Sequence, residues 1–107
     1  MSKYRNIKTT VDGITFDSRK EADRYCELKL LQRAGAITDL KLQVQFELQP
    51  GFTLNGKKIR AIHYIADFMY QEGGVYIVED VKGRKTKEYM LKRKMYAYRY
   101  GQEIKEV

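Results

Sequence analysis

Residues 64–68 read YIADF and residues 78–83 read VEDVKG, and each stretch sets charged side chains into a run with the composition of a buried strand. Burying a carboxylate or an ammonium group is unfavourable unless an opposite charge or a metal ion compensates it. Asp80 and Lys82 are two residues apart, so in a strand their side chains lie on one face. If the two strands are neighbours, Asp67 joins them, and the three charges predict one site of chemical function.

Turn and cap signals place regular elements around these stretches. Asp12-Gly13 favours a type I′ turn and so predicts a small N-terminal hairpin. Ser18, followed three residues later by Glu21, has the spacing of a capping box that begins a helix. Apolar periodicity and turn residues predict the other elements. They are the rest of that helix to residue 34, strands over 40–48, 59–70 and 75–81, a helix over 88–100 and a strand over 103–107.

The predicted order is helix, three strands, helix and strand, with the small hairpin in front. It indicates an α/β or α+β fold in which the strands over 59–70 and 75–81 are antiparallel. The last strand follows a helix, so it can pair in parallel through a crossover. A chain of 107 residues is expected to form a single domain over 1–107 with one active site.

Composition narrows the functional classes. A single cysteine, Cys26, excludes an intrachain disulfide and a cysteine-based zinc site, and we expect it to be buried in the first helix. No stretch has the apolar length of a signal peptide or a membrane span. These features predict a cytoplasmic protein with no membrane partner.

The net charge of +7 is confined to one segment. Between residues 82 and 99, eight Lys or Arg residues accompany one acidic residue, and the rest of the chain is balanced. This concentration indicates a polyanion, DNA or RNA, although a solvated basic helix face has the same composition. Seven-residue spacing predicts one stripe of Lys85, Lys92 and Arg99, and with Lys87 these are the predicted nucleic-acid contacts. Tyrosines of the same helix suit either base stacking or packing against the sheet.

A hard divalent cation fits this combination of carboxylates and basic residues. Mg²⁺ takes oxygen ligands, and it can activate water and neutralise a phosphodiester during hydrolysis; Mn²⁺ can replace it. Asp67 and Asp80 are predicted metal ligands, and the main-chain carbonyl of Val81 is a third. Lys82 is predicted to orient or help deprotonate the attacking water.

The spacing of Asp67 and Asp80-Val81-Lys82, with twelve residues between them, resembles the PD-(D/E)xK nuclease signature. Asp80 stands at its Asp/Glu position, and Ala66 stands where many members have proline. The predicted order of elements is similar to the common core of that superfamily. Residues 16–25 and 79–83 are also similar to those of small phage and prophage proteins placed in it.

This resemblance implies a restriction-endonuclease-like core and a Mg²⁺-dependent endonuclease reaction that leaves a 5′-phosphate. It also implies an acidic residue on the first helix, where Glu21 is the matching position for assisting the metal or the water. So small a domain has little surface for reading sequence, so we expect recognition of branched DNA by a homodimer. The most specific function that we predict is Holliday-junction resolution in phage recombination or replication, in the host cytoplasm. The alternatives are a non-catalytic nucleic-acid-binding module and a non-specific nuclease.

Each candidate residue also has a purely structural explanation. Asp67 suits the cap of a turn at the end of a strand. Asp80 and Lys82 suit an exposed charge ladder on a sheet surface. Glu21 suits the capping box and then needs no metal. Glu79 points away from Asp80 in a regular strand, so it is placed outside the site unless a bulge intervenes.

Overall fold

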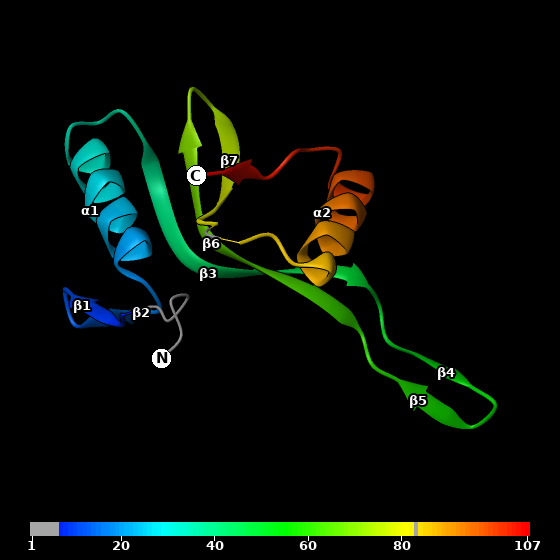
Figure 1. Cartoon of the computed structure of the whole chain (residues 1–107). Helices are drawn as coiled ribbons and strands as arrows, with labels where there is room; N and C mark the ends of the chain where they lie inside the picture. Colours follow the sequence, from blue (N-terminus) through cyan, green and yellow to red (C-terminus); the bar gives the residue numbers. More distant parts are fainter. Residues whose placement is uncertain (1–6, 83) are drawn as a thin grey trace.

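A four-stranded mixed sheet forms the centre of the computed structural model, which describes residues 7–82 and 84–107 (Figure 1). Its strands, in sheet order, are β3 (Thr38–Gln49), β6 (Ile62–Glu72), β7 (Val75–Asp80) and β8 (Lys105–Glu106). The first three are antiparallel, and β8 is parallel to β7. The parallel pair follows from the helix that intervenes between these two strands, as the sequence predicts.

Two capped helices flank this sheet. Helix α1 (Arg19–Arg33) begins after Ser18, whose hydroxyl accepts the Glu21 N–H at 3.1 Å. Helix α2 (Lys87–Tyr100) begins after Thr86, whose hydroxyl accepts the Tyr89 N–H at 3.1 Å. It ends at Gly101, which has a left-handed φ of 65°.

Two small hairpins stand outside the sheet. The strands β1 (Thr9–Val11) and β2 (Ile14–Phe16) meet at the predicted Asp12-Gly13 turn. The strands β4 (Phe52–Leu54) and β5 (Lys57–Ile59) meet at Asn55-Gly56. Each turn has two consecutive residues with positive φ, as a type I′ turn requires.

The α+β prediction and the order helix, three strands, helix, strand are confirmed for the central sheet. The strand predicted over 59–70 instead divides, because residues up to Ile59 belong to the second hairpin and β6 begins at Ile62. The prediction that Cys26 is buried is wrong, since its side chain lies on the exposed face of α1. No helix within residues 7–82 and 84–107 is both long and apolar enough to cross a membrane.

Two hydrophobic clusters join the helices to the sheet. The buried residues of the α1 cluster are Phe16, Ala22, Tyr25, Leu28, Ile37, Phe68 and Tyr70. Those of the α2 cluster are Leu48, Tyr64, Ala66, Val78, Tyr89, Tyr96 and Ile104. Each helix therefore has its own core, and the strands β3 and β6 contribute to both.

Strand β6 changes sides at Asp67. In a regular strand Ala66 and Phe68 would lie on one face, but Ala66 packs in the α2 cluster and Phe68 in the α1 cluster. The facing position of β3 is Gln43, whose φ of 51° lies in the left-handed region. Both strands bend here, and Figure 1 shows β3 passing first beside α1 and then below α2. The bend places Asp67 between the two cores.

Arg24 of α1 holds the buried carboxylate of Glu79 on β7. The carboxylate accepts hydrogen bonds from Arg24 Nε at 2.9 Å, from Arg24 Nη2 at 2.6 Å and from the Tyr70 hydroxyl. Burial alone would raise the pKa of Glu79, but these donors outweigh burial and lower it. Glu79 thus points away from Asp80, as predicted, and links α1 to the sheet.

Replacing Arg24 should destabilise the fold strongly. Arg24→Met leaves the Glu79 carboxylate buried without its cation, which costs about 3–5 kcal/mol of unfolding free energy. Because the folded-state pKa of Glu79 is lowered, this stabilisation is present above its ordinary pKa of 4.5 and is lost as the pH falls. Urea unfolding followed by circular dichroism should therefore show a large difference from wild type at pH 7 and a small one in acid.

Two further variants separate the buried pair from ordinary surface charge. Glu27→Gln removes the exposed carboxylate that Arg24 contacts at 3.0 Å, and it should change stability by less than about 1 kcal/mol. The double variant Arg24→Met/Glu79→Met should recover most of the loss, because it leaves no unpaired charge. Equal losses in Arg24→Met and Glu27→Gln would contradict this account.

Candidate active site

Three elements bring acidic side chains towards one place. Glu21 lies in the first turn of α1, Asp67 in the middle of β6 and Asp80 at the end of β7. Glu21 and Asp80 are buried, with 9% and 4% of their surface exposed. The exposed-ladder explanation of Asp80 is therefore wrong, and so is a turn-capping position for Asp67 at a strand end. The Ser18 hydroxyl accepts the Glu21 N–H, which is one half of the predicted capping box. Among the described residues, no hydrogen bond joins the Glu21 carboxylate to the Ser18 N–H, so the box does not account for the carboxylate.

Hydrogen bonds orient the two aspartates. One oxygen of Asp67, Oδ2, accepts the Val81 N–H at 2.8 Å, and the other faces Gln43 Nε2 at 3.5 Å. Asp80 Oδ2 accepts the Tyr64 hydroxyl, and Asp80 Oδ1 lies 2.9 Å from Lys82 Nζ. The predicted proximity of Asp80 and Lys82 is thus confirmed. The carbonyl of Val81 as a metal ligand stays a prediction.

The carboxylates oppose one another electrostatically. Burial raises the pKa of Glu21 to about 7, and the negative charges of Asp67, Asp17 and Asp80 add to the rise. Burial also raises the pKa of Asp67, and the adjacent Asp80 carboxylate raises it further, against lowering by the Val81 N–H and by Lys82. Burial and mutual repulsion therefore disfavour ionisation of Glu21 and Asp67 at this place.

Lys82 is held between a carboxylate and an aromatic ring. Its Nζ ion-pairs with Asp80 and lies 3.9 Å from the centroid of the Tyr89 ring, a cation–π distance. The Lys82 carbonyl accepts a hydrogen bond from Lys20 Nζ at 2.9 Å. The loop after β7 is therefore tied to both α1 and α2, through Lys20 of α1 and Tyr89 of α2.

The oxygen atoms of these carboxylates are the kind of ligand that a hard divalent cation prefers. Glu21, Asp67 and Asp80 supply oxygen atoms, and burial together with mutual repulsion disfavours ionisation of the first two, a cost that a bound cation would reduce. Within the described residues, no group of three or more acidic, histidine or cysteine side chains is placed so that it could hold a metal ion by itself. Two carboxylates with water and a substrate phosphate can complete a Mg²⁺ shell without such a cage.

The predicted nucleic-acid contacts do not form one stripe. Lys85 precedes α2, because the helix begins at Lys87, and it ion-pairs with Glu106 at 2.9 Å. Arg99 contacts Glu47 at 3.3 Å, and Lys92 lies 3.7 Å from Glu88. The prediction of a continuous stripe including Lys85 is therefore wrong, because seven-residue spacing has no meaning outside the helix.

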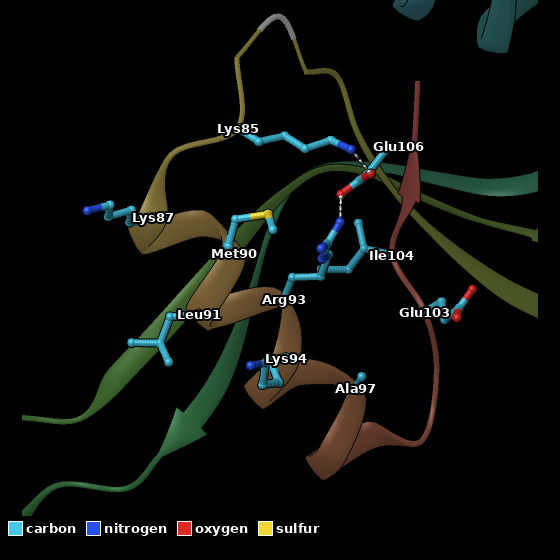
Figure 2. A pocket seen from close by; sticks show the side chains of 10 residues that line it. All are labelled: Lys85, Lys87, Met90, Leu91, Arg93, Lys94, Ala97, Glu103, Ile104 and Glu106. Carbon is cyan, nitrogen blue, oxygen red and sulfur yellow. Dashed lines mark hydrogen bonds and ion pairs between the residues drawn. The ribbon is translucent and has the colours of Figure 1, made fainter.

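A groove of about 850 Å³ lies between α2 and the C-terminal segment (Figure 2). Lys85 and Arg93 both reach Glu106 across it, and Lys87 lies at its edge. The lining contains neither the three carboxylates nor Lys82. This groove is thus separate from the candidate site.

The structure adds supporting residues that the sequence did not single out. Tyr64 and Tyr89 hold Asp80 and Lys82, and Lys20 holds the following loop. Tyr64 lies three residues before Asp67 on β6, and its hydroxyl donates to Asp80 on the neighbouring strand β7. No spacing rule predicts these contacts, because each joins different elements.

Comparison with protein families gives a match over nearly the whole chain. The matching family is described as "Protein of unknown function (DUF1064)", and its model covers residues 1–106. Comparisons with curated proteins and with solved structures found no match. The matched range includes every residue of the candidate site. The chain therefore belongs to the DUF1064 family.

Proposed function

We propose that this protein is a metal-dependent DNA endonuclease with a restriction-endonuclease-like core. The observation that carries the proposal is the convergence of Glu21, Asp67 and Asp80 from three elements, with the pKa of the first two raised. Such crowding disfavours the folded state, and binding of a divalent cation would relieve it. The spacing of Asp67, Asp80 and Lys82 and the order of the elements support the same conclusion.

The three carboxylates and the Val81 carbonyl are the groups that would hold Mg²⁺ or Mn²⁺. When bound, such an ion supplies activation of water and neutralisation of the phosphate. The Val81 N–H and the Tyr64 hydroxyl each bind one oxygen of an aspartate and so orient both side chains. The second oxygens face Gln43 Nε2 and Lys82 Nζ, with which a bound ion would share them. The carboxylates are therefore held in place before the substrate binds, as an efficient active site requires.

Lys82 supplies the positive charge nearest to the carboxylates. Its ammonium group, 2.9 Å from Asp80, can orient the attacking water and stabilise charge that develops on the phosphate. The Tyr89 ring and the Asp80 carboxylate limit its rotamers, so the charge is pre-positioned. Lys20 adds a second cation at the same loop.

The expected substrate is branched or junction DNA, cut in phage recombination or replication. Cutting both strands of a junction needs two active sites, so a twofold homodimer fits the substrate. Lys87, Lys92 and Arg99 remain the proposed phosphate contacts of α2, while Lys85 also has a structural partner in Glu106.

Cleavage assays test the proposed activity. Purified protein should cut labelled DNA with Mg²⁺ or Mn²⁺ and not with EDTA, and four-way and flapped DNA should be cut faster than linear duplex. Asp80→Asn and Lys82→Ala should each lower the rate at least about 100-fold, because each removes an interaction with the reacting phosphate or its water. Gel electrophoresis of end-labelled products measures both effects.

The matched control is the exposed ion pair of Lys41 with Asp39, at 3.6 Å. Asp39→Asn and Lys41→Ala remove the same charges and should leave the rate within about twofold of wild type. Wild-type protein that cuts none of the substrates would overturn the proposal in favour of a non-catalytic binding module. Cleavage that survives Asp80→Asn would reject the site, and equal digestion of all substrates would show a non-specific nuclease.

Glu21→Gln should separate stability from metal binding. The folded-state pKa of Glu21 is raised to about 7 from 4.5, so ionisation destabilises the fold progressively as pH rises between these values. Without added metal, the variant should therefore melt at a higher temperature than wild type at pH 8 and at the same temperature at pH 4. Differential scanning fluorimetry measures this shift.

Added Mg²⁺ should reverse that order. At pH 8 we expect Mg²⁺ to raise the melting temperature of wild type, since it binds the ionised carboxylates, and to raise that of Glu21→Gln much less. The response of wild type should weaken as the pH falls below about 7, where Glu21 is protonated. A Mg²⁺ response that is the same in both proteins would remove Glu21 from the site.

A further inference from the structure

The hairpin β4–β5 projects from the body of the protein as an arm (Figure 1). Every residue from 51 to 60 is exposed. The radius of gyration of 16.1 Å exceeds the roughly 13 Å typical of a domain of about 100 residues, in agreement with a projecting element. A two-stranded hairpin is marginally stable by itself. Because this arm does not pack on the core, contact with a binding partner would stabilise it.

The arm is basic without any acidic neighbour. Residues 48–66 contain Lys57, Lys58 and Arg60 and no Asp or Glu. In the part of the chain that the structure describes, no carboxylate lies within ion-pair distance of these three cations. This contrasts with Lys82, Lys85 and Arg99, which have acidic partners. The charge of the arm is thus available to an external polyanion.

The register of the arm gives it two different faces. Phe52 pairs with Ile59 and Leu54 with Lys57, so these four side chains share one face. Thr53 and Lys58 pair on the other face. Phe52, Leu54 and Ile59 are 46%, 57% and 38% exposed. This exposure is unfavourable, because burying apolar side chains away from water lowers the free energy. One face therefore suits apolar contact, while lysines lie on both faces.

We propose that the β4–β5 arm lies in the major groove of duplex DNA beside the cleavage site. The major groove admits a two-stranded β-ribbon, where apolar side chains can contact thymine methyl groups. Lys57, Lys58 and Arg60 bind phosphates on the groove walls, while Phe52 and Leu54 face the base edges. The inference deepens the proposed function, on which it rests for DNA as the polyanion.

The arm and the candidate site belong to the same pair of strands. The chain continues from β3 into β4 and returns from β5 into β6, which carries Asp67. Ile59 and Asp67 are eight residues apart, which is at most about 26 Å of extended chain. At about 3.4 Å per base pair, this reach sets the base of the arm, at Ile59, within roughly eight base pairs of the cut phosphate. The bent strands thus connect the arm to the site.

Equilibrium binding in EDTA tests the arm without requiring cleavage. Fluorescence anisotropy would measure the affinity of Asp80→Asn protein for a labelled 30-base-pair duplex over a series of salt concentrations. Adding Lys57→Ser, Lys58→Ser and Arg60→Ser should reduce the slope of log affinity against log salt by about 2–3, since three phosphate contacts are lost. The control variant Lys29→Ser/Arg33→Ser/Lys41→Ser removes three charges elsewhere and should change the slope by less than 1. Equal slope changes in the two variants would overturn the proposal.

A second variant tests the apolar face of the arm. Phe52→Thr/Leu54→Thr should weaken binding at least about tenfold with an unchanged salt slope, because it removes groove contacts and no phosphate contact. If this variant changes the oligomeric state in sedimentation and leaves DNA affinity intact, the arm binds a second copy and the proposal fails. Loss of binding in the arm variants would support the arm even if wild-type protein cut no DNA, so the two proposals fail separately.

Discussion

Compensation of buried charge on β7 is the constraint on which the rest of the structure depends. Glu79 and Asp80 are adjacent, and both are buried, on opposite sides of the strand. Glu79 meets Arg24 and Tyr70, which lower its pKa, so this carboxylate stabilises the fold. On the side of Asp80, the pKa of Asp67 and of Glu21 is raised. One strand thus carries Glu79, which stabilises the fold, and Asp80, which ion-pairs with Lys82 beside two carboxylates whose pKa is raised.

The bend at Asp67 makes this division possible. A flat sheet with regular alternation would direct Ala66 and Phe68 to one helix. Instead each residue packs in a different core, and the left-handed Gln43 accommodates the change in β3. A non-glycine residue in that conformation costs about 1–2 kcal/mol, which two separate cores can repay. The strain lies beside Asp67, at the position to which we assign function.

Local signals predicted the elements well because turns, caps and periodicity act over a few residues. The Asp12-Gly13 turn, the Ser18 cap and the end of the second helix at residue 100 are all at the predicted positions. The same reasoning failed where contacts between distant segments determine the structure. It placed Ile59 of β5 in one strand with the residues of β6, and it predicted that Cys26 is buried. It also extended a helical stripe to Lys85, which lies before α2 and ion-pairs with Glu106 of β8.

The sequence by itself determined the order of the elements and the identity of the charged candidates, since both are written in short-range patterns. It placed Asp80 and Lys82 together because two residues in or after a strand cannot be far apart. Only the tertiary structure decided that Glu79 faces Arg24, that Tyr64 and Tyr89 position Asp80 and Lys82, and that Glu21 approaches the aspartates. These contacts join different elements, so they follow from how the helices pack on a bent sheet, which no local pattern encodes.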